Sequence, residues 1–362
     1  MKFKILAFFA VTLLLLNACK KDTNNNSNGV SYDATPYAFN YGNLPAPAIS
    51  ADNQLTVQGV KLGRMLFYET MLSKDGTMSC ASCHKQQDAF TDTSKFSIGV
   101  RGLKGKRQAM AVFNMAWNTN EFFWDGRSHL LRHQSLKPIQ DELEMDETLA
   151  NVVTKLSQNQ SYKDQFMRAF GSEEITPDKM SLAMEQFMNS IVSNNSKYDQ
   201  YLAGKTQLTP AEERGRKLFF KEYNPFFPDS SGADCAHCHG GMNFENDLYM
   251  NNGLDDDASI TDIGREKVTQ NAGDKAKFKV PSLRNIALTP PYMHDGRFAT
   301  LEEVVNHYNK GLKQSATLDP ALQQTIAKGL LLDAQEKADL VAFLKTLTDV
   351  TLTTNPVYSN PF

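Results

Sequence analysis

The five residues Cys80-Ala81-Ser82-Cys83-His84 recur with a single substitution as Cys235-Ala236-His237-Cys238-His239. Both runs have the form C-x-x-C-H, which is typical of covalent attachment of a c-type haem. Two cysteines about one helical turn apart reach the two vinyl groups of one porphyrin, and the histidine that follows binds the iron from the proximal side. The sequence therefore predicts two covalently bound haem c groups. Their attachment cysteines are Cys80, Cys83, Cys235 and Cys238, and their proximal iron ligands are His84 and His239.

A C-x-x-C pair also occurs in zinc sites and in thioredoxin-like redox proteins. A four-cysteine zinc site does not require a histidine directly after each second cysteine, and a redox pair is expected near a βαβ pattern, which we do not find in this sequence. Both alternatives are therefore less favoured than haem attachment. His237, inside the second run, is expected to be exposed rather than to bind a metal.

The first nineteen residues predict an export signal. Lys2 and Lys4 precede a mostly apolar stretch of twelve residues, 5–16, which is too short to span a bilayer. The run Leu16-Asn17-Ala18-Cys19 then places small residues before a cysteine, as in bacterial lipoprotein signals. We expect a signal peptide over residues 1–19 and lipidation of Cys19. The alternative is an ordinary secretion signal in which Cys19 is incidental.

Composition predicts a tether after this signal and narrows the choice of partners. Residues 20–48 are rich in asparagine, with scattered serine, lysine and proline, and do not bury enough apolar area to fold alone. We expect a flexible tether that joins a lipid anchor to the folded part. Haem c is attached outside the cytoplasm in bacteria, so the location expected is the periplasm or the cell surface. A net charge of −3 gives no basic field for binding nucleic acid.

The two haem motifs belong to a longer internal repeat. Gly63-Arg64-Met65-Leu66-Phe67 precedes the first motif, and Gly215-Arg216-Lys217-Leu218-Phe219 precedes the second. Downstream, Trp124-Asp125-Gly126-Arg127 is matched by His294-Asp295-Gly296-Arg297. Matched features in the same order indicate a duplication. Helix signals dominate, including the capping box of Thr209-Pro210-Ala211-Glu212. We expect an all-α protein with two cytochrome c-like haem domains and long loops, over residues 49–205 and 206–350, followed by a tail over 351–362.

Four further runs carry a family resemblance between about residues 58 and 349. They are Leu62-Gly63-Arg64, Phe123-Trp124-Asp125-Gly126-Arg127, Pro138-Ile139 with Glu144-Met145, and Pro281-Ser282-Leu283-Arg284-Asn285 continuing to Pro291-Tyr292-Met293-His294. In these runs the chain resembles the bacterial dihaem cytochrome c peroxidases, a family that includes MauG. The resemblance implies that hydrogen peroxide reacts at the N-terminal haem. The C-terminal haem would receive electrons from a small donor protein, either a c-type cytochrome or a cupredoxin.

The resemblance also implies roles for three side chains near the first haem. Gln134 and Glu144 would move a proton between the two oxygens of the peroxide, a task suited to a carboxyl whose pKa is raised by apolar surroundings. Trp124 would lie between the haems and carry an electron or a hole. The alternatives are that Gln134 and Glu144 are solvated residues of a charged segment and that Trp124 is a core residue.

Two positions depart from the usual pattern of the family. Many members carry a second histidine sixteen residues after the first proximal histidine, and here that position is Val100. Because valine does not bind iron, we expect an open first haem in the resting protein. The position of the distal methionine of the second haem is occupied by Tyr308, as in MauG. Tyr308 also shares a helical face with Leu301 and Val305, unlike His307, so it is the expected distal ligand. The alternative is a tyrosine that only packs near the haem.

Further expectations rest on the resemblance alone. A calcium ion between the haems would involve Thr289, Pro291 and Gln108, the last in place of the usual asparagine. Dimers occur in the family, so a homodimer is a further expectation. The leading interpretation is an oxidoreductase of the cytochrome c peroxidase type that reduces hydrogen peroxide with electrons from a small redox protein. The alternatives are a MauG-like oxidase that modifies side chains of a protein partner and a dihaem electron carrier without catalysis.

Overall fold

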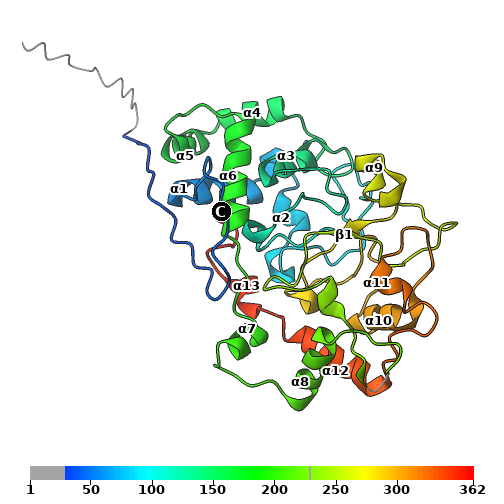
Figure 1. Cartoon of the computed structure of the whole chain (residues 1–362). Helices are drawn as coiled ribbons and strands as arrows, with labels where there is room; N and C mark the ends of the chain where they lie inside the picture. The colour runs from blue at the N-terminus through cyan, green and yellow to red at the C-terminus, as the bar shows by residue number, and fades with distance from the viewer. Residues whose placement is uncertain (1–28, 228–229) are drawn as a thin grey trace, which may run out of the picture.

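A computed structural model of the chain describes residues 29–227 and 230–362 (Figure 1). The predicted signal peptide, the lipidation site Cys19 and the start of the predicted tether lie outside the described residues. Within the described part, no helix combines the length and the apolar character that a bilayer span requires.

The fold is mostly helical, as predicted. The helices of the first half are α1 (Val57–Tyr68), α2 (Cys80–Cys83), α3 (Leu131–Gln140), α4 (Leu149–Ser157), α5 (Gln160–Phe170) and α6 (Pro177–Ser190). Those of the second half are α7 (Lys197–Leu202), α8 (Pro210–Phe220), α9 (Glu266–Thr269), α10 (Leu301–Asn306), α11 (Pro320–Gln323), α12 (Ala334–Lys345) and α13 (Val350–Thr354). Two short strands, β1 (Tyr249–Met250) and β2 (Phe278–Lys279), pair antiparallel. Long loops connect these elements and surround the centre of the molecule (Figure 1).

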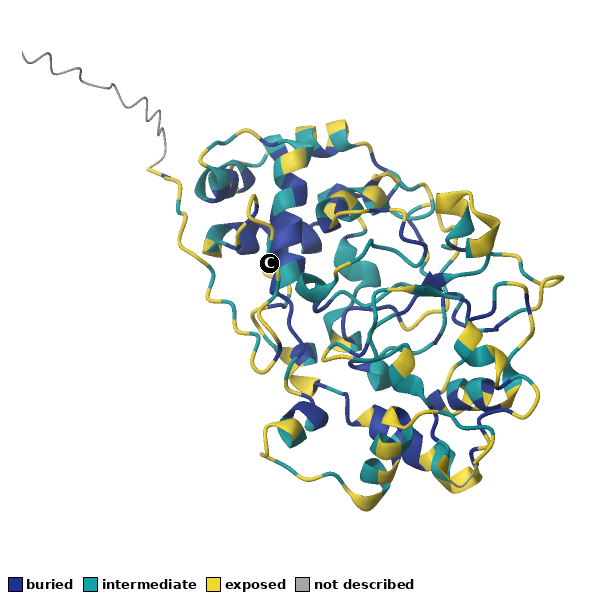
Figure 2. Ribbon diagram, in the orientation of Figure 1, coloured by how far each residue is buried: buried dark blue, intermediate teal, exposed yellow. Residues whose placement is uncertain are grey.

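Each half has its own apolar core, and the two cores are built in the same way. In the first half α1 packs on α6, whose residues are mostly buried (Figure 2). In the second half α8 packs on α12. A Cβ added at Gly63 of α1 would overlap the carbonyl oxygen of Ala183, and one added at Gly215 of α8 would overlap that of Asp339. The repeated glycine therefore permits the same close helix approach in both halves, which gives the duplication a structural basis.

The described part of the predicted tether lies against the first half and does not extend freely into solvent. The backbone N–H of Asp33 donates to the carbonyl of Arg168 (2.9 Å), and that of Tyr37 donates to Leu55 (3.0 Å). Val30 and Leu44 are buried. Apolar residues scattered among the polar ones thus fix this segment over residues 29–48, a difference from the expected flexible tether.

The C-terminal tail crosses back to the first half. Leu352 and Tyr358 are buried in the core built around α1 and α6. The Arg64 side chain of α1 donates to the carbonyl oxygens of Ser359 (2.6 Å) and Pro356 (2.8 Å). The tail therefore completes the packing of the N-terminal half.

Candidate dihaem site

Both C-x-x-C-H runs open onto one large cavity in the middle of the molecule. Its volume is about 1290 Å³, larger than the roughly 300–1,000 Å³ of ordinary ligand pockets. Its wall includes Cys83 and His84 of the first run and Cys235, Cys238 and His239 of the second. Loops of both halves contribute much of the rest of the wall, together with residues of α3, α8, α10 and α12 and of the two strands.

The first run is held as a single helical turn with a fixed histidine. α2 begins after Ser79, whose side chain forms a capping box with Ser82. Nδ1 of His84 lies 3.1 Å from the carbonyl oxygen of Phe90. Burial lowers the pKa of His84 and so favours the neutral ring. With Nδ1–H donating to the carbonyl, the lone pair of Nε2 is free to bind iron.

The second run repeats this arrangement. Cys235–His237 forms a short 3-10 turn, and Nδ1 of His239 lies 3.1 Å from the carbonyl of Pro281 and 3.3 Å from that of Phe244. Burial lowers the pKa of His239 to about 4, so this ring is also neutral. His237 is exposed, as predicted.

The chemistry of both donor sets fits covalently attached haem. Cys80, Cys83, Cys235 and Cys238 form no disulfides with one another. Burial raises the pKa of Cys80 and of Cys235 to about 12, so these thiols are neutral groups in apolar surroundings. Each pair stands beside a neutral imidazole whose Nδ1 is already occupied. These residues would hold two haem groups at the shared cavity.

Glu144 and Gln134 both lie on the cavity wall on the side of the first run. Gln134 comes from α3, and Glu144 from the loop that follows it. Burial raises the pKa of Glu144 to about 7; the charge of Asp141 adds to this rise and that of Arg127 opposes it. The charge of Glu144 also acts on the thiols of the first run. Glu144 is thus a half-buried carboxyl on the cavity wall rather than a fully solvated residue.

Val100 does not line the cavity. Its backbone N–H donates to the carbonyl oxygen of Glu144 (2.8 Å) and so fixes the loop that carries this carboxyl. The histidines on the described wall are the two proximal candidates and His294. The ring of His294 stacks on Phe278 at 3.7 Å between ring centroids.

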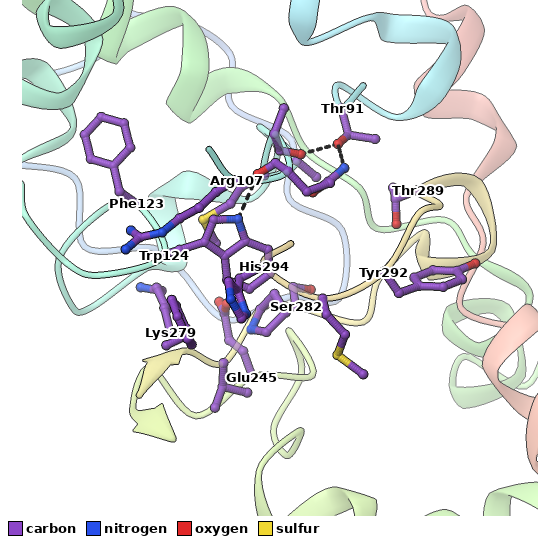
Figure 3. A pocket seen from close by; sticks show the side chains of 18 of the residues that line it. Thr91, Arg107, Phe123, Trp124, Glu245, Lys279, Ser282, Thr289, Tyr292 and His294 are labelled. Carbon is purple, nitrogen blue, oxygen red and sulfur yellow. Dashed lines mark hydrogen bonds between the residues drawn. The ribbon is translucent and has the colours of Figure 1, made fainter. Parts of the chain in front are cut away.

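Trp124 and its repeat partner His294 join the two halves through the backbone. The indole Nε1–H of Trp124 donates to the carbonyl of Gln108 (2.8 Å), and the N–H of Gln108 donates to the carbonyl of His294 (2.8 Å). In the mirrored contact, the N–H of Lys279 donates to the carbonyl of Trp124 (2.7 Å). Figure 3 shows Trp124 and His294 within the cavity. Trp124 therefore contacts both halves where they meet.

Two groups of charged residues on this wall were not singled out by the sequence analysis. Arg107 pairs with Asp125 (2.7 Å) and Asp262 (2.7 Å) and so links a loop of each half. Glu245 is a half-buried carboxyl whose pKa is raised to about 7 by burial, with the charge of Asp247 adding to the rise. The buried Lys279 lies nearby and pairs with Asp247 (3.4 Å). The internal repeat contains a signal that could have pointed to Lys279. This residue lies 171 residues after Gln108, and the same offset relates Asn114 to Asn285.

Tyr308 lies on the wall beside the second run. Leu301 and Val305 of α10 are buried, and the helix widens into a π-helical turn over His307–Gly311. Such turns are frequent at functional sites. The hydroxyl of Tyr308 accepts a hydrogen bond from Asn252 Nδ2 (3.4 Å), and burial raises its pKa to about 12. The side chain of His307 makes a different contact with the same residue: its Nε2 lies 3.0 Å from the backbone carbonyl oxygen of Asn252.

The three residues named for calcium lie on the same cavity wall. The side-chain amide of Gln108 donates to Thr91 Oγ1 (3.0 Å) and to the carbonyl of Asp92 (3.1 Å). Thr289 and Pro291 lie in the loop before His294. The calcium site stays a prediction.

Known proteins are similar to this chain over most of its length. The profile of the family described as di-haem cytochrome c peroxidase matches residues 57–207. The methylamine utilization protein MauG of Methylophilus methylotrophus is 32% identical, covering 84% of this chain and 85% of the relative. Cytochrome c551 peroxidase of Nitrosomonas europaea is 34% identical, covering 84% of each chain. A solved structure, described as a MauG-like protein associated with microbial copper homeostasis, has a TM-score of 0.80 at 36% identity, covering 88% of this chain and 97% of that one.

The fold and the paired motifs define a mostly helical c-type protein with two haem-binding runs on one cavity. The chain belongs to the family of dihaem cytochrome c peroxidases and MauG proteins. Because the relatives include both kinds of protein, the choice between their activities depends on the residues of the site.

Proposed function

We propose that this protein reduces hydrogen peroxide to water at its first haem site, with electrons delivered at the second by a c-type cytochrome or a cupredoxin. Each turnover would consume one peroxide, two electrons and two protons and release two waters. The observation that carries this proposal is Glu144, a half-buried carboxyl of near-neutral pKa on the cavity wall beside the first C-x-x-C-H run.

When bound, the first haem supplies an iron to which peroxide binds. The chain supplies the movement of the proton. Glu144, as the carboxylate, would accept a proton from bound peroxide and return it to the oxygen that leaves as water. Gln134 provides an amide N–H donor on the same wall, and Trp124 joins the two halves along the route of the electrons.

The first test is the resting spectrum of the haem-loaded protein. With Val100 where many relatives have a histidine, we expect a high-spin ferric signal from an open first iron. A wholly low-spin spectrum would contradict this part of the proposal. Six-coordinate iron at both haems, inert to peroxide and cyanide, would overturn the catalytic function and leave an electron carrier.

Tyr308 favours a second candidate function. Anionic oxygen donors stabilise ferric iron, whereas a thioether favours the ferrous state. If Tyr308 binds the second iron, this haem is a weak acceptor of electrons and suits a MauG-like oxidase that acts on side chains of a protein partner. The 36% identical MauG-like structure supports this alternative.

Peroxide turnover separates the two functions. Steady consumption of peroxide with a reduced small cytochrome supports the peroxidase. Retention of two oxidising equivalents by the protein, with little oxidation of the cytochrome, supports the oxidase. We further propose, from residues 1–19 of the sequence, that the enzyme acts in the periplasm or at the cell surface through a lipid on Cys19.

A further inference from the structure

One amide group connects two side chains of the second haem site. Nδ2 of Asn252 donates both to Sδ of Met293 (3.3 Å) and to the hydroxyl of Tyr308 (3.4 Å). All three residues line the cavity. The thioether and the phenol therefore lie close together on the wall that faces the second run.

The position of Asn252 is itself fixed to the element that carries Tyr308. Its backbone carbonyl oxygen lies 3.0 Å from Nε2 of His307, the residue before Tyr308. Met293 is held from the other side by a loop closed between Tyr292 and Phe298. It has a backbone φ of +75°, which is uncommon for a residue with a side chain.

Comparison of the two repeats shows that the pair Met293 and Tyr308 is specific to the second half. The bridge Phe122–Ser128 corresponds to Tyr292–Phe298, and α3 begins 170 residues before α10. At this offset Met293 corresponds to Phe123, which has a φ of +70°, and Tyr308 corresponds to Pro138.

Both first-half residues also line the cavity, but neither has an atom that binds iron. The same two backbone positions thus carry two non-ligands in the first half and two metal-binding side chains in the second. This difference agrees with an open iron at the first haem and with ligation of the second iron by Tyr308.

We propose that Met293 is a second distal ligand for the iron held at His239, and that it replaces Tyr308 when this iron is reduced. The proposal rests on the second candidate function, in which Tyr308 binds the ferric iron of the second haem. A phenolate prefers ferric iron and a thioether prefers ferrous iron, so the two side chains suit the two oxidation states. Methionine has three rotatable bonds, which allow Sδ to move while the backbone stays fixed.

The exchange balances as one electron and one proton. The small donor protein supplies the electron, the bond from iron to the phenolate oxygen breaks, and the bond from iron to Sδ forms. The released phenolate takes one proton from solvent and becomes a phenol. Reoxidation reverses each change. Asn252 has two amide hydrogens, so it bonds whichever side chain is released.

The experiment compares Met293→Leu and Tyr308→Phe with the unmodified haem-loaded protein. Reduced with dithionite, the unmodified protein should bind one carbon monoxide per chain rapidly, at the first haem only. Met293→Leu should bind two, while its ferric spectrum stays unchanged. Ferric Tyr308→Phe should become low-spin with the near-infrared band of thioether ligation, and this band should be lost in the double variant. Met250→Leu, which changes another methionine of the cavity wall, is the matched control and should leave the spectra and the stoichiometry unchanged.

Different results would overturn the ligation by Tyr308 and the exchange with Met293. If Tyr308→Phe leaves the ferric spectrum of the second haem unchanged, Tyr308 is not its ligand and the basis of the exchange is lost. If that variant becomes five-coordinate or binds water, Tyr308 is the ligand but Met293 is not its substitute. An unchanged carbon monoxide stoichiometry in Met293→Leu also overturns the exchange.

Discussion

Glu144 is distinguished from the acidic residues around it by its surroundings and not by its type. Two positions along the chain, Asp146 is hydrogen-bonded by Arg101 and Lys74, which lower its pKa to about 2. Burial has the opposite effect on Glu144 and raises its pKa to about 7. Carboxyls whose environments push their pKa values apart are suited to different tasks. Only Glu144 of this pair exchanges a proton readily near neutral pH.

Replacing Glu144 by glutamine removes this exchange and keeps the shape of the side chain. We expect the second-order rate of the reaction with peroxide to fall by about 10²–10⁴-fold, the usual contribution of general acid–base catalysis. Stopped-flow absorbance measures this rate, and haem content should be unchanged. Glu142→Gln is the control, because the side chain of Glu142 is 68% exposed and bonded to Arg101. Equal rates in the two variants would remove Glu144 from the mechanism.

The dependence on pH follows from the same residue. Because its raised pKa is about 7, Glu144 is mostly protonated below this pH and accepts no proton from peroxide. The rate should therefore rise as the pH increases through 7 and become constant above it. In the Glu144→Gln variant the rate should not rise as the pH passes through 7. If the variant keeps this rise, the titrating group is another one, such as Glu245.

At the scale of elements, the packing of α1 on α6 and of α8 on α12 depends on one glycine each. A methyl group at Gly63 would overlap the backbone of Ala183 and approach Phe187. Gly63→Ala should therefore lower the free energy of unfolding by about 1–3 kcal/mol, as overpacked cores do.

Denaturant unfolding of the haem-loaded protein measures this change. Gly105→Ala is the matched control, since the nearest atom to its new Cβ is 3.7 Å away. Gly215→Ala should repeat the loss in the second half. If neither Gly63→Ala nor Gly215→Ala changes the free energy of unfolding, the helix pairs separate without cost. That result would contradict a requirement for close helix approach in the two halves.

The elements and much of the site could be predicted because their signals are local. The C-x-x-C-H runs require only residue type and spacing, and the one-sided face of Leu301 and Val305 is sufficient to place Tyr308 on the inner side of its helix. The contact of Asn252 with Met293 and Tyr308 could not be predicted, because it joins two loops and a π-helical turn whose relative positions depend on tertiary packing. The partial burial of Glu144 likewise follows from the way its loop folds and not from its charged neighbours.

At the scale of the whole molecule, the halves are interlocked rather than joined by one linker. The backbones of Trp124 and His294 are each bonded to a strand or loop of the opposite half. The chain also returns at its end, so that Leu352 of α13 is buried in the core of the first half with 1% of its surface exposed. The stability of the N-terminal half therefore depends on residues at the far end of the sequence.

This dependence gives a prediction with a control on the same helix. Leu352→Ala should cost about 2–5 kcal/mol of unfolding free energy, because it removes a buried leucine from a packed core. Val350→Ala, at a residue of α13 that is 64% exposed, should stay within about 0.5 kcal/mol of the unmodified protein. Denaturant unfolding should be followed separately at the haem absorbance and by circular dichroism. If the two variants unfold alike, the tail adds nothing to the first core, and the N-terminal half is stable on the contacts of α1 and α6 alone.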